Sequence, residues 1–128
     1  MTWLSLMLTG EIGLAGAAGA VARYLLGYTI AKHTRISFPS GTLVINVSGA
    51  LLIGFILALA TRHVLSSTSQ VILATGFLGG YTTFSTMSWE GVQLAREGNR
   101  LQSLLYLGGN VLPGLLAAAL GMVLGGWI

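Results

Sequence analysis

Long stretches without a charged residue dominate this chain. The segments 36–61, 63–89 and 101–128 contain no Asp, Glu, Lys or Arg. The segment 12–31 contains Arg23 as its only charged residue. A helix needs about 20 mostly apolar residues to cross the hydrocarbon core of a membrane. The sequence therefore predicts four membrane-spanning helices.

The composition supports the same fold class. Only 7% of the residues are charged, against roughly 25% in soluble domains, and 19 of the 128 residues are glycine. Small residues allow helices to pack closely in lipid. We predict an all-α membrane protein with one integral membrane domain over residues 1–128, surrounded by membrane lipid. Its expected spans cover residues 11–31, 41–60, 70–95 and 101–127.

The basic residues are distributed unequally between the two sides of the membrane. Four of them, Lys32, Arg35, Arg96 and Arg100, fall in the first and third predicted loops, whereas the opposite side has only Arg62. The positive-inside rule favours termini outside the cytoplasm. We expect a multi-pass protein of the inner (cytoplasmic) membrane. The net charge of +3 is spread over loops, so no nucleic-acid partner is expected.

The third span carries the most informative segment. It contains Gly79-Gly80 followed by Thr82-Thr83, at mid-membrane depth. Glycine pairs are poor helix interiors, and a helix break frees carbonyl oxygens that suit a hard cation. The segment predicts a broken helix with an ion bound at the break. A glycine pair that packs within an intact helix is the alternative.

Neutral polar residues recur at helical spacing in the other spans. Thr42 and Asn46 share a face of the second span, and Tyr106 and Asn110 share a face of the fourth. Together with the hydroxyl-rich run Thr82–Ser88, they offer the neutral donors that suit a small anion, and aromatic ring edges add weak contacts. Hydrogen bonding between helices explains the same residues equally well.

Two charged residues and the histidines complete the survey. Arg23 is either a functional charge within the membrane or a side chain that extends to the first loop. Glu90 is either a solvated helix end or part of a relay. His33 and His63 lie in loops without a second metal ligand at suitable spacing. We expect no enzymatic activity.

Three segments together resemble the CrcB/Fluc family of fluoride channels. They are Gly19-Ala20-Val21-Ala22-Arg23-Tyr24, Gly41-Thr42-Leu43-Val44-Ile45-Asn46, and Gly76-Phe77-Leu78-Gly79-Gly80-Tyr81-Thr82-Thr83-Phe84-Ser85-Thr86. Their order and spacing match the family over nearly the whole chain, and the third run is highly specific.

This resemblance implies passive fluoride export through an antiparallel, dual-topology dimer with two pathways, which lowers fluoride toxicity. It also implies a structural sodium ion at the dimer centre, held by main-chain carbonyls of Gly79 and Thr82 from both subunits. The family's pathway residues map onto Thr42, Asn46, Phe84, Ser85, Thr86, Met87, Glu90 and Asn110 of this sequence. Arg23 matches the arginine of the first span, a candidate vestibule charge.

The sequence departs from the family at Met87, where the second pathway phenylalanine is expected, and at Gly114, where many relatives have serine. Methionine is apolar and flexible but lacks a positive ring edge. The unequal loop charges also depart from the near-balanced loops that dual insertion needs. A homodimer is expected, and a heterodimer with an oppositely oriented paralogue is the alternative.

Two other functions remain at this stage. A proton-coupled multidrug exporter with four spans would need a carboxylate within the first span, and the only acid nearby is Glu11 at its start. A membrane subunit that scaffolds other proteins without transport would need neither aligned polar groups nor a helix break.

Overall fold

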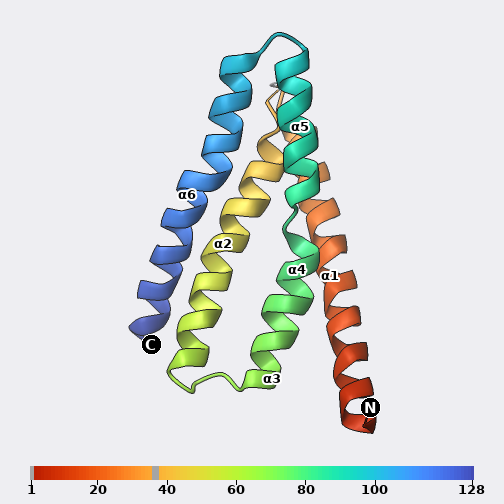
Figure 1. The fold of residues 1–128 in the computed structure, drawn as a ribbon, viewed down its shortest axis with the longest axis vertical. Coiled ribbons are helices and arrows are strands. Elements are labelled where there is room, and N and C mark those ends of the chain that lie inside the picture. The colour runs from red at the N-terminus through yellow and green to blue at the C-terminus, as the bar shows by residue number, and fades with distance from the viewer. Residues whose placement is uncertain (1, 36–37) are drawn as a thin grey trace.

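The computed structural model describes residues 2–35 and 38–128, which are helical apart from links and ends. The helices are α1 (Trp3–His33), α2 (Ser40–Thr61), α3 (Ser67–Gln70), the π-helix η1 (Val71–Leu78), α4 (Gly79–Tyr81), α5 (Phe84–Arg96) and α6 (Arg100–Gly126). Three of them, α1, α2 and α6, are long and apolar enough to cross a membrane. The third crossing is divided: α3, η1 and α4 run end to end, and α5 follows after a break (Figure 1). The predicted all-α membrane fold with a broken third helix is confirmed.

Local capping sets where several helices begin. Thr2 caps α1, since its hydroxyl accepts a hydrogen bond from the Ser5 amide at 3.2 Å, while the Ser5 hydroxyl accepts from the Thr2 amide at 3.0 Å. This reciprocal capping box explains why α1 begins at Trp3, earlier than the span expected from hydropathy. Ser66 caps α3 and Thr83 caps α5 more simply, because each hydroxyl accepts from one backbone amide, that of Ser69 and that of Thr86.

The break in the third span lies at Thr82 and Thr83. Both residues have extended backbone, with φ and ψ of −82° and 159° at Thr82 and −146° and 122° at Thr83. Gly79 and Gly80 are helical, so the break lies just beyond the glycine pair. A Cβ atom at Gly80 would collide with the main-chain carbonyl of Gly16. This glycine is therefore needed for the close approach of α1.

Helix packing places α2 at the centre of the molecule. Its most extensive contacts are with α6, while α1 packs against η1 and α4, and α5 packs against α6. Ile45, Leu78 and Tyr81 form a small buried core where α2 meets the third span. Most other large apolar side chains are exposed, as expected for helices that face lipid.

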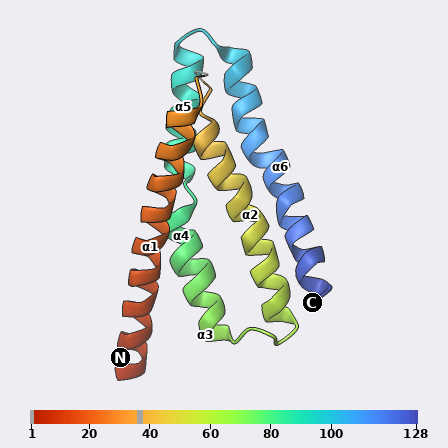
Figure 2. The same cartoon turned by 180° about the vertical axis from the view of Figure 1, so that it is seen from behind.

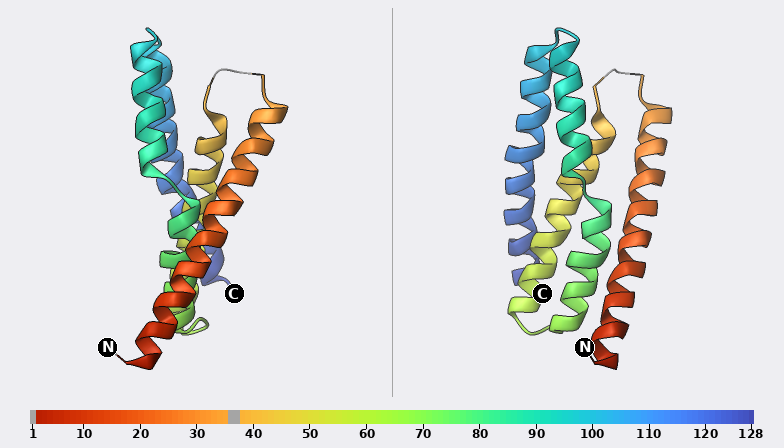
Figure 3. Two further views of the ribbon diagram at one scale, coloured as in Figure 1. Left: turned by 90° about the vertical axis from the view of Figure 1, so that its right-hand side faces the viewer. Right: turned by 45° about the vertical axis from the view of Figure 1, so that its right-hand side comes forward.

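The bundle has two different ends. Both termini lie at one end together with the link between α2 and α3, and the link between α5 and α6 lies at the opposite end (Figures 1 and 2). Near that opposite end, α5 and α6 separate from α1 and α2, as the left view of Figure 3 shows. The break lies where this separation starts.

Candidate functional site

Asn46 binds both main-chain polar groups of Thr83. Its Nδ2 donates to the carbonyl of Thr83 at 3.0 Å, and its Oδ1 accepts from the amide of Thr83, also at 3.0 Å. Nδ2 also donates to Oδ1 of Asn110 at 2.9 Å. The side chain from α2 thus replaces the helical partners that Thr83 loses at the break. Buried backbone groups need such partners.

Glu90 is held by two hydroxyl groups. Oε1 accepts from the Thr42 hydroxyl at 3.1 Å, and Oε2 accepts from the Tyr106 hydroxyl at 2.6 Å. Asn110 continues the chain of contacts, because its Nδ2 donates to the main-chain carbonyl of Tyr106 at 2.9 Å. A connected set of hydrogen bonds therefore joins α2, the break, α5 and α6. We call it the polar cluster; its members are Thr42, Asn46, Thr83, Glu90, Tyr106 and Asn110.

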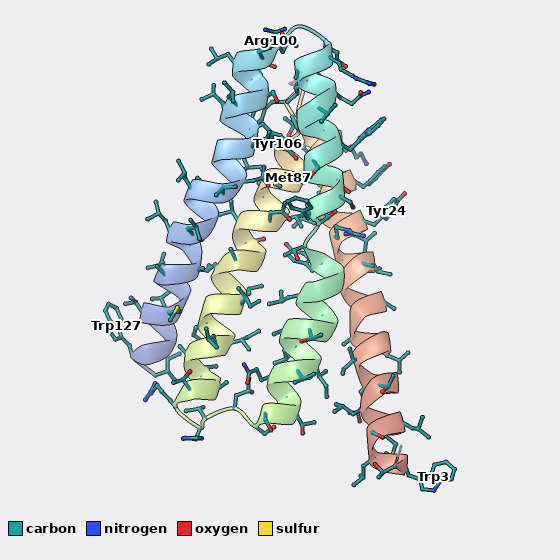
Figure 4. All side chains as sticks on the ribbon, in the orientation of Figure 1. Trp3, Tyr24, Met87, Arg100, Tyr106 and Trp127 are labelled. Carbon is teal, nitrogen blue, oxygen red and sulfur yellow. The ribbon has the colours of Figure 1, made fainter. Side chains whose placement is uncertain are left out.

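The polar cluster is largely inaccessible to solvent. Tyr106 has an exposed fraction of 0%, and the ring of Phe38 meets its ring edge-on, with centroids 5.5 Å apart. Thr42, Thr83 and Asn110 are also buried. Figure 4 shows Tyr106 at nearly the same level as Met87, which follows the break by one helical turn. The cluster thus lies beside the break.

Three further predicted residues lie on the surface of α5. Phe84, Ser85 and Thr86 are exposed, with Phe84 reaching an exposed fraction of 77%, and Met87 is half-buried. The hydroxyl groups of Ser85 and Thr86 lie 3.4 and 3.0 Å from the Thr83 hydroxyl. The predicted pathway residues therefore form two sets, a buried one and an exposed one, which meet at Thr83.

Two grooves flank the break, and Thr83 lines both. The first, which we call the break groove, has a volume of about 330 Å³ and a mostly apolar lining. Its lining residues closest to the break are Asn46, Gly79, Thr82, Thr83, Phe84 and Met87. The second, the arginine groove, has a volume of about 460 Å³. Its lining includes Arg23, Thr42, Thr83, Thr86 and Glu90.

The break brings two helix ends of opposite polarity together. The C-terminal end of α4 exposes carbonyl oxygens with partial negative charge, and the N-terminal end of α5 exposes amides with partial positive charge. Thr83 donates its amide to Asn46, so the carbonyl of Gly79 lacks the partner that a continuous helix would supply. Arg23 Nη1 donates to the Thr82 carbonyl at 3.3 Å. One side of the break thus suits a cation and the other an anion.

The residues at the break fit a cation bound by carbonyl oxygens. Over residues 2–35 and 38–128, no three His, Cys, Asp or Glu side chains lie together in a way that could hold a metal ion. The carbonyls of Gly79 and Thr82 end a helix, and Gly79 is exposed in the break groove. A carbonyl oxygen has two lone pairs, so the Thr82 carbonyl can accept from Arg23 and still face an ion.

The predicted pathway omitted two members of the polar cluster, Thr83 and Tyr106. The spacing of four residues between Tyr106 and Asn110 was visible in the sequence, but the partner of Tyr106, Glu90, lies on another helix. The role of the Thr83 amide was equally hidden, because it depends on Asn46 lying opposite the break. The structure also brings Arg23 to the break through Thr82, although 59 positions separate the two residues.

Comparisons with known proteins match the chain over nearly its whole length. Residues 11–122 match the family model described as CrcB-like protein, Camphor Resistance (CrcB). The chain is 45% identical to fluoride-specific ion channel FluC 1 of Leifsonia xyli, covering 90% of this chain and 84% of the relative. It is 46% identical to fluoride-specific ion channel FluC of Aquifex aeolicus, covering 89% and 93%. It is 40% identical to fluoride-specific ion channel FluC 2 of Moorella thermoacetica, covering 98% of both.

Proposed function

This chain belongs to the CrcB-like family, and we propose that it is a channel for passive fluoride export across the cytoplasmic membrane. Export lowers the toxicity of fluoride inside the cell. The observation that carries the proposal is the identity of 40–46% to relatives named fluoride-specific ion channels, over about nine-tenths of the chain or more. The chain is a multi-pass membrane protein, and its activity is transport rather than catalysis.

The proposed path runs along α5 and passes the break. Asn46, Phe84 and Met87 line it within the break groove, while Thr42, Thr86 and Glu90 line it within the arginine groove, with Ser85 and Asn110 adjacent. Hydroxyl and amide donors replace water around a small anion one contact at a time. The amides at the N-terminal end of α5 add partial positive charge at the same depth. Phe84 contributes its ring edge.

Asn46 contributes to the path through its amide group. Both Nδ2 hydrogens already have acceptors, the Thr83 carbonyl and Oδ1 of Asn110. An entering fluoride ion replaces one of these acceptors, and the contact with Asn110 is the one made between two side chains. Asn46 therefore exchanges a hydrogen bond rather than gaining one, which limits how tightly it holds the ion.

The proposed assembly is an antiparallel dimer of dual topology with two paths. The exposed Phe84 and Gly79 leave the break groove open on one side of this subunit. A second copy closes the groove, and a structural sodium ion lies at the dimer centre on the carbonyls of Gly79 and Thr82. The ion supplies positive charge where the ends of broken helices from both subunits meet. Pairing with an oppositely oriented paralogue is the alternative assembly.

Fluoride efflux from liposomes tests the proposal. Vesicles that contain only this purified chain are loaded with fluoride, and valinomycin with a potassium gradient prevents the build-up of a membrane potential. A fluoride electrode should report fast efflux, whereas matched vesicles loaded with chloride should retain their anion. Well-folded protein that releases no fluoride, alone or with an oppositely oriented partner, would contradict the proposal. A proton-coupled exporter would release no fluoride under these conditions.

A further inference from the structure

We infer that Arg23 acts as a resident cation at the break, where its charge opposes the binding of sodium at the Thr82 carbonyl. The inference rests on the sodium site of the proposed function. Arg23 is the only Lys or Arg residue between positions 1 and 31. In the structure its Nη1 donates to the main-chain carbonyl of Thr82 at 3.3 Å. The guanidinium thus lies on the negative end of the first half of the broken span.

The packing of α1 delivers Arg23 to this position. Gly19 lies one turn before Arg23, and a Cβ atom there would collide with the carbonyl of Phe77. Gly16 precedes Gly19 by about one turn and lies equally close to the third span, because a Cβ atom at Gly80 would collide with the Gly16 carbonyl. These contacts fix the distance of α1 from η1 and α4. Arg23, on the same face as Gly19, therefore reaches the end of α4 without a change in the backbone.

The neighbouring carboxylate does not account for the position of the guanidinium. Glu90 lines the same groove, but its two oxygens accept from Thr42 and Tyr106. The hydrogen bond of Arg23 goes instead to the backbone carbonyl at the break. A charged donor within a membrane span strongly prefers such a partner to lipid.

Two cations that share one carbonyl oxygen repel each other. Arg23 gives the helix end of each subunit a positive partner in the absence of a metal ion. A sodium ion bound by the Gly79 and Thr82 carbonyls would be repelled by the positive charge of the guanidinium. Arg23 therefore lowers the affinity of the site for sodium and makes folding of the subunit less dependent on this ion.

The substitution Arg23→Gln tests this role, because glutamine keeps a donor and removes the charge. We would measure the melting temperature of the purified detergent-solubilised protein as sodium replaces N-methylglucamine at constant ionic strength. The half-saturating sodium concentration should fall by about tenfold in Arg23→Gln, as expected for removal of a nearby unit charge. Arg23→Lys keeps the charge and should behave as the unsubstituted protein does.

Arg62→Gln is the matched control. Arg62 Nη1 also donates to a carbonyl near a helix C-terminus, that of Gly125 at 2.9 Å, but at the far end of the bundle. Its substitution should leave the sodium dependence unchanged. Three results would overturn the inference. The half-saturating sodium concentration could be unchanged in Arg23→Gln, or Arg23→Lys could show the same change as Arg23→Gln. Arg23→Gln could also fail to fold at any sodium concentration.

Fluoride efflux from the unsubstituted protein separates this inference from the proposed function. If efflux and sodium dependence are both present and Arg23→Gln changes neither, the inference about Arg23 fails while the channel assignment stands. If the unsubstituted protein shows efflux but sodium does not affect its melting temperature, the sodium site and the inference fail together. If efflux is absent, the proposed function fails regardless of Arg23.

Discussion

Two side chains from different helices hold the two extended residues of the third span. Asn46 of α2 binds the amide and carbonyl of Thr83, and Arg23 of α1 binds the carbonyl of Thr82. Each supplies a hydrogen-bond partner that the interrupted helix cannot provide. The same contacts join α1 and α2 to the third span at the break.

Removing the Asn46 amide should damage both stability and transport. Asn46→Ala leaves two main-chain groups of Thr83 without their partner, and each unsatisfied buried group costs about 1–3 kcal/mol. We expect a loss of about 2–6 kcal/mol in unfolding free energy and a strong reduction of fluoride efflux. Thermal unfolding in detergent and the electrode assay measure these effects.

Ser48→Ala is the control on the same helix. Ser48 lies 2.9 Å from the hydroxyl of Tyr81, away from the extended backbone, so its removal should cost about 1 kcal/mol and preserve efflux. If Asn46→Ala were no more harmful than Ser48→Ala, the amide would not hold the break.

Met87 should support fluoride passage without an aromatic ring. It lies in the break groove beside Phe84, where a flexible apolar side chain fills the same space. We expect the unsubstituted protein to conduct, and Met87→Phe to change the rate of efflux without creating or abolishing it. Efflux that is absent in the unsubstituted protein and appears in Met87→Phe would refute this expectation.

The residue types in the third span predicted that the helix is broken, but they did not predict which side chains bind the backbone at the break. The glycine pair, the threonines and the hydroxyl-rich run indicated an interrupted third span, and the structure has one. The partner of Thr83 could not be predicted, because it depends on how α2 is rotated against a distant part of the chain. The assignment of residues to the fluoride path and the sodium site stays a prediction.

Among the helices, the pairing of α1 with the third span depends on glycines. Gly16, Gly19 and Gly80 allow main-chain atoms of the two segments to approach more closely than any side chain would permit. The π-helical turns of η1 lie in this contact region. No residue pattern in Val71–Leu78 predicted a π-helix, and this segment packs along α1.

A methyl group at Gly19 should separate these helices. In Gly19→Ala the new Cβ atom meets the Phe77 carbonyl, and backbone cannot move aside as a flexible side chain can. We expect a loss of roughly 1–3 kcal/mol in unfolding free energy, as is typical of overpacking. Melting curves in detergent measure this loss.

Gly13→Ala is the comparison within the same helix. Nothing lies within 4 Å of a Cβ atom at Gly13, so alanine should be neutral there or stabilise α1 by up to about 1 kcal/mol. Equal melting temperatures for the two variants would show that close packing at Gly19 does not hold α1 in place.

For the whole molecule, the sequence predicted the class of fold but left the assembly open. Hydropathy and charge spacing were sufficient for an all-α membrane protein, because the bilayer restricts what a chain can form within it. Loop charges favour one orientation, whereas the family resemblance implies two. A single subunit does not decide between these alternatives, since both orientations have the same internal contacts.

Cysteine labelling measures the orientation directly, because the chain contains no native cysteine. We place a single cysteine at Glu97, an exposed residue in the link between α5 and α6 whose φ of −77° any residue can adopt. For a dual-topology homodimer, a membrane-impermeant maleimide should label part of the population in intact cells and the remainder after permeabilisation. Labelling from one side only would indicate a fixed orientation and require an oppositely oriented second chain.

The central claim is that this chain conducts fluoride selectively. We would record currents across a planar bilayer that contains only the purified chain, with a tenfold fluoride gradient and equal chloride on both sides. The account predicts a current that reverses near the fluoride equilibrium potential, about 59 mV from zero. A current that reverses near zero, or no current from protein that is folded and inserted in both orientations, would contradict it.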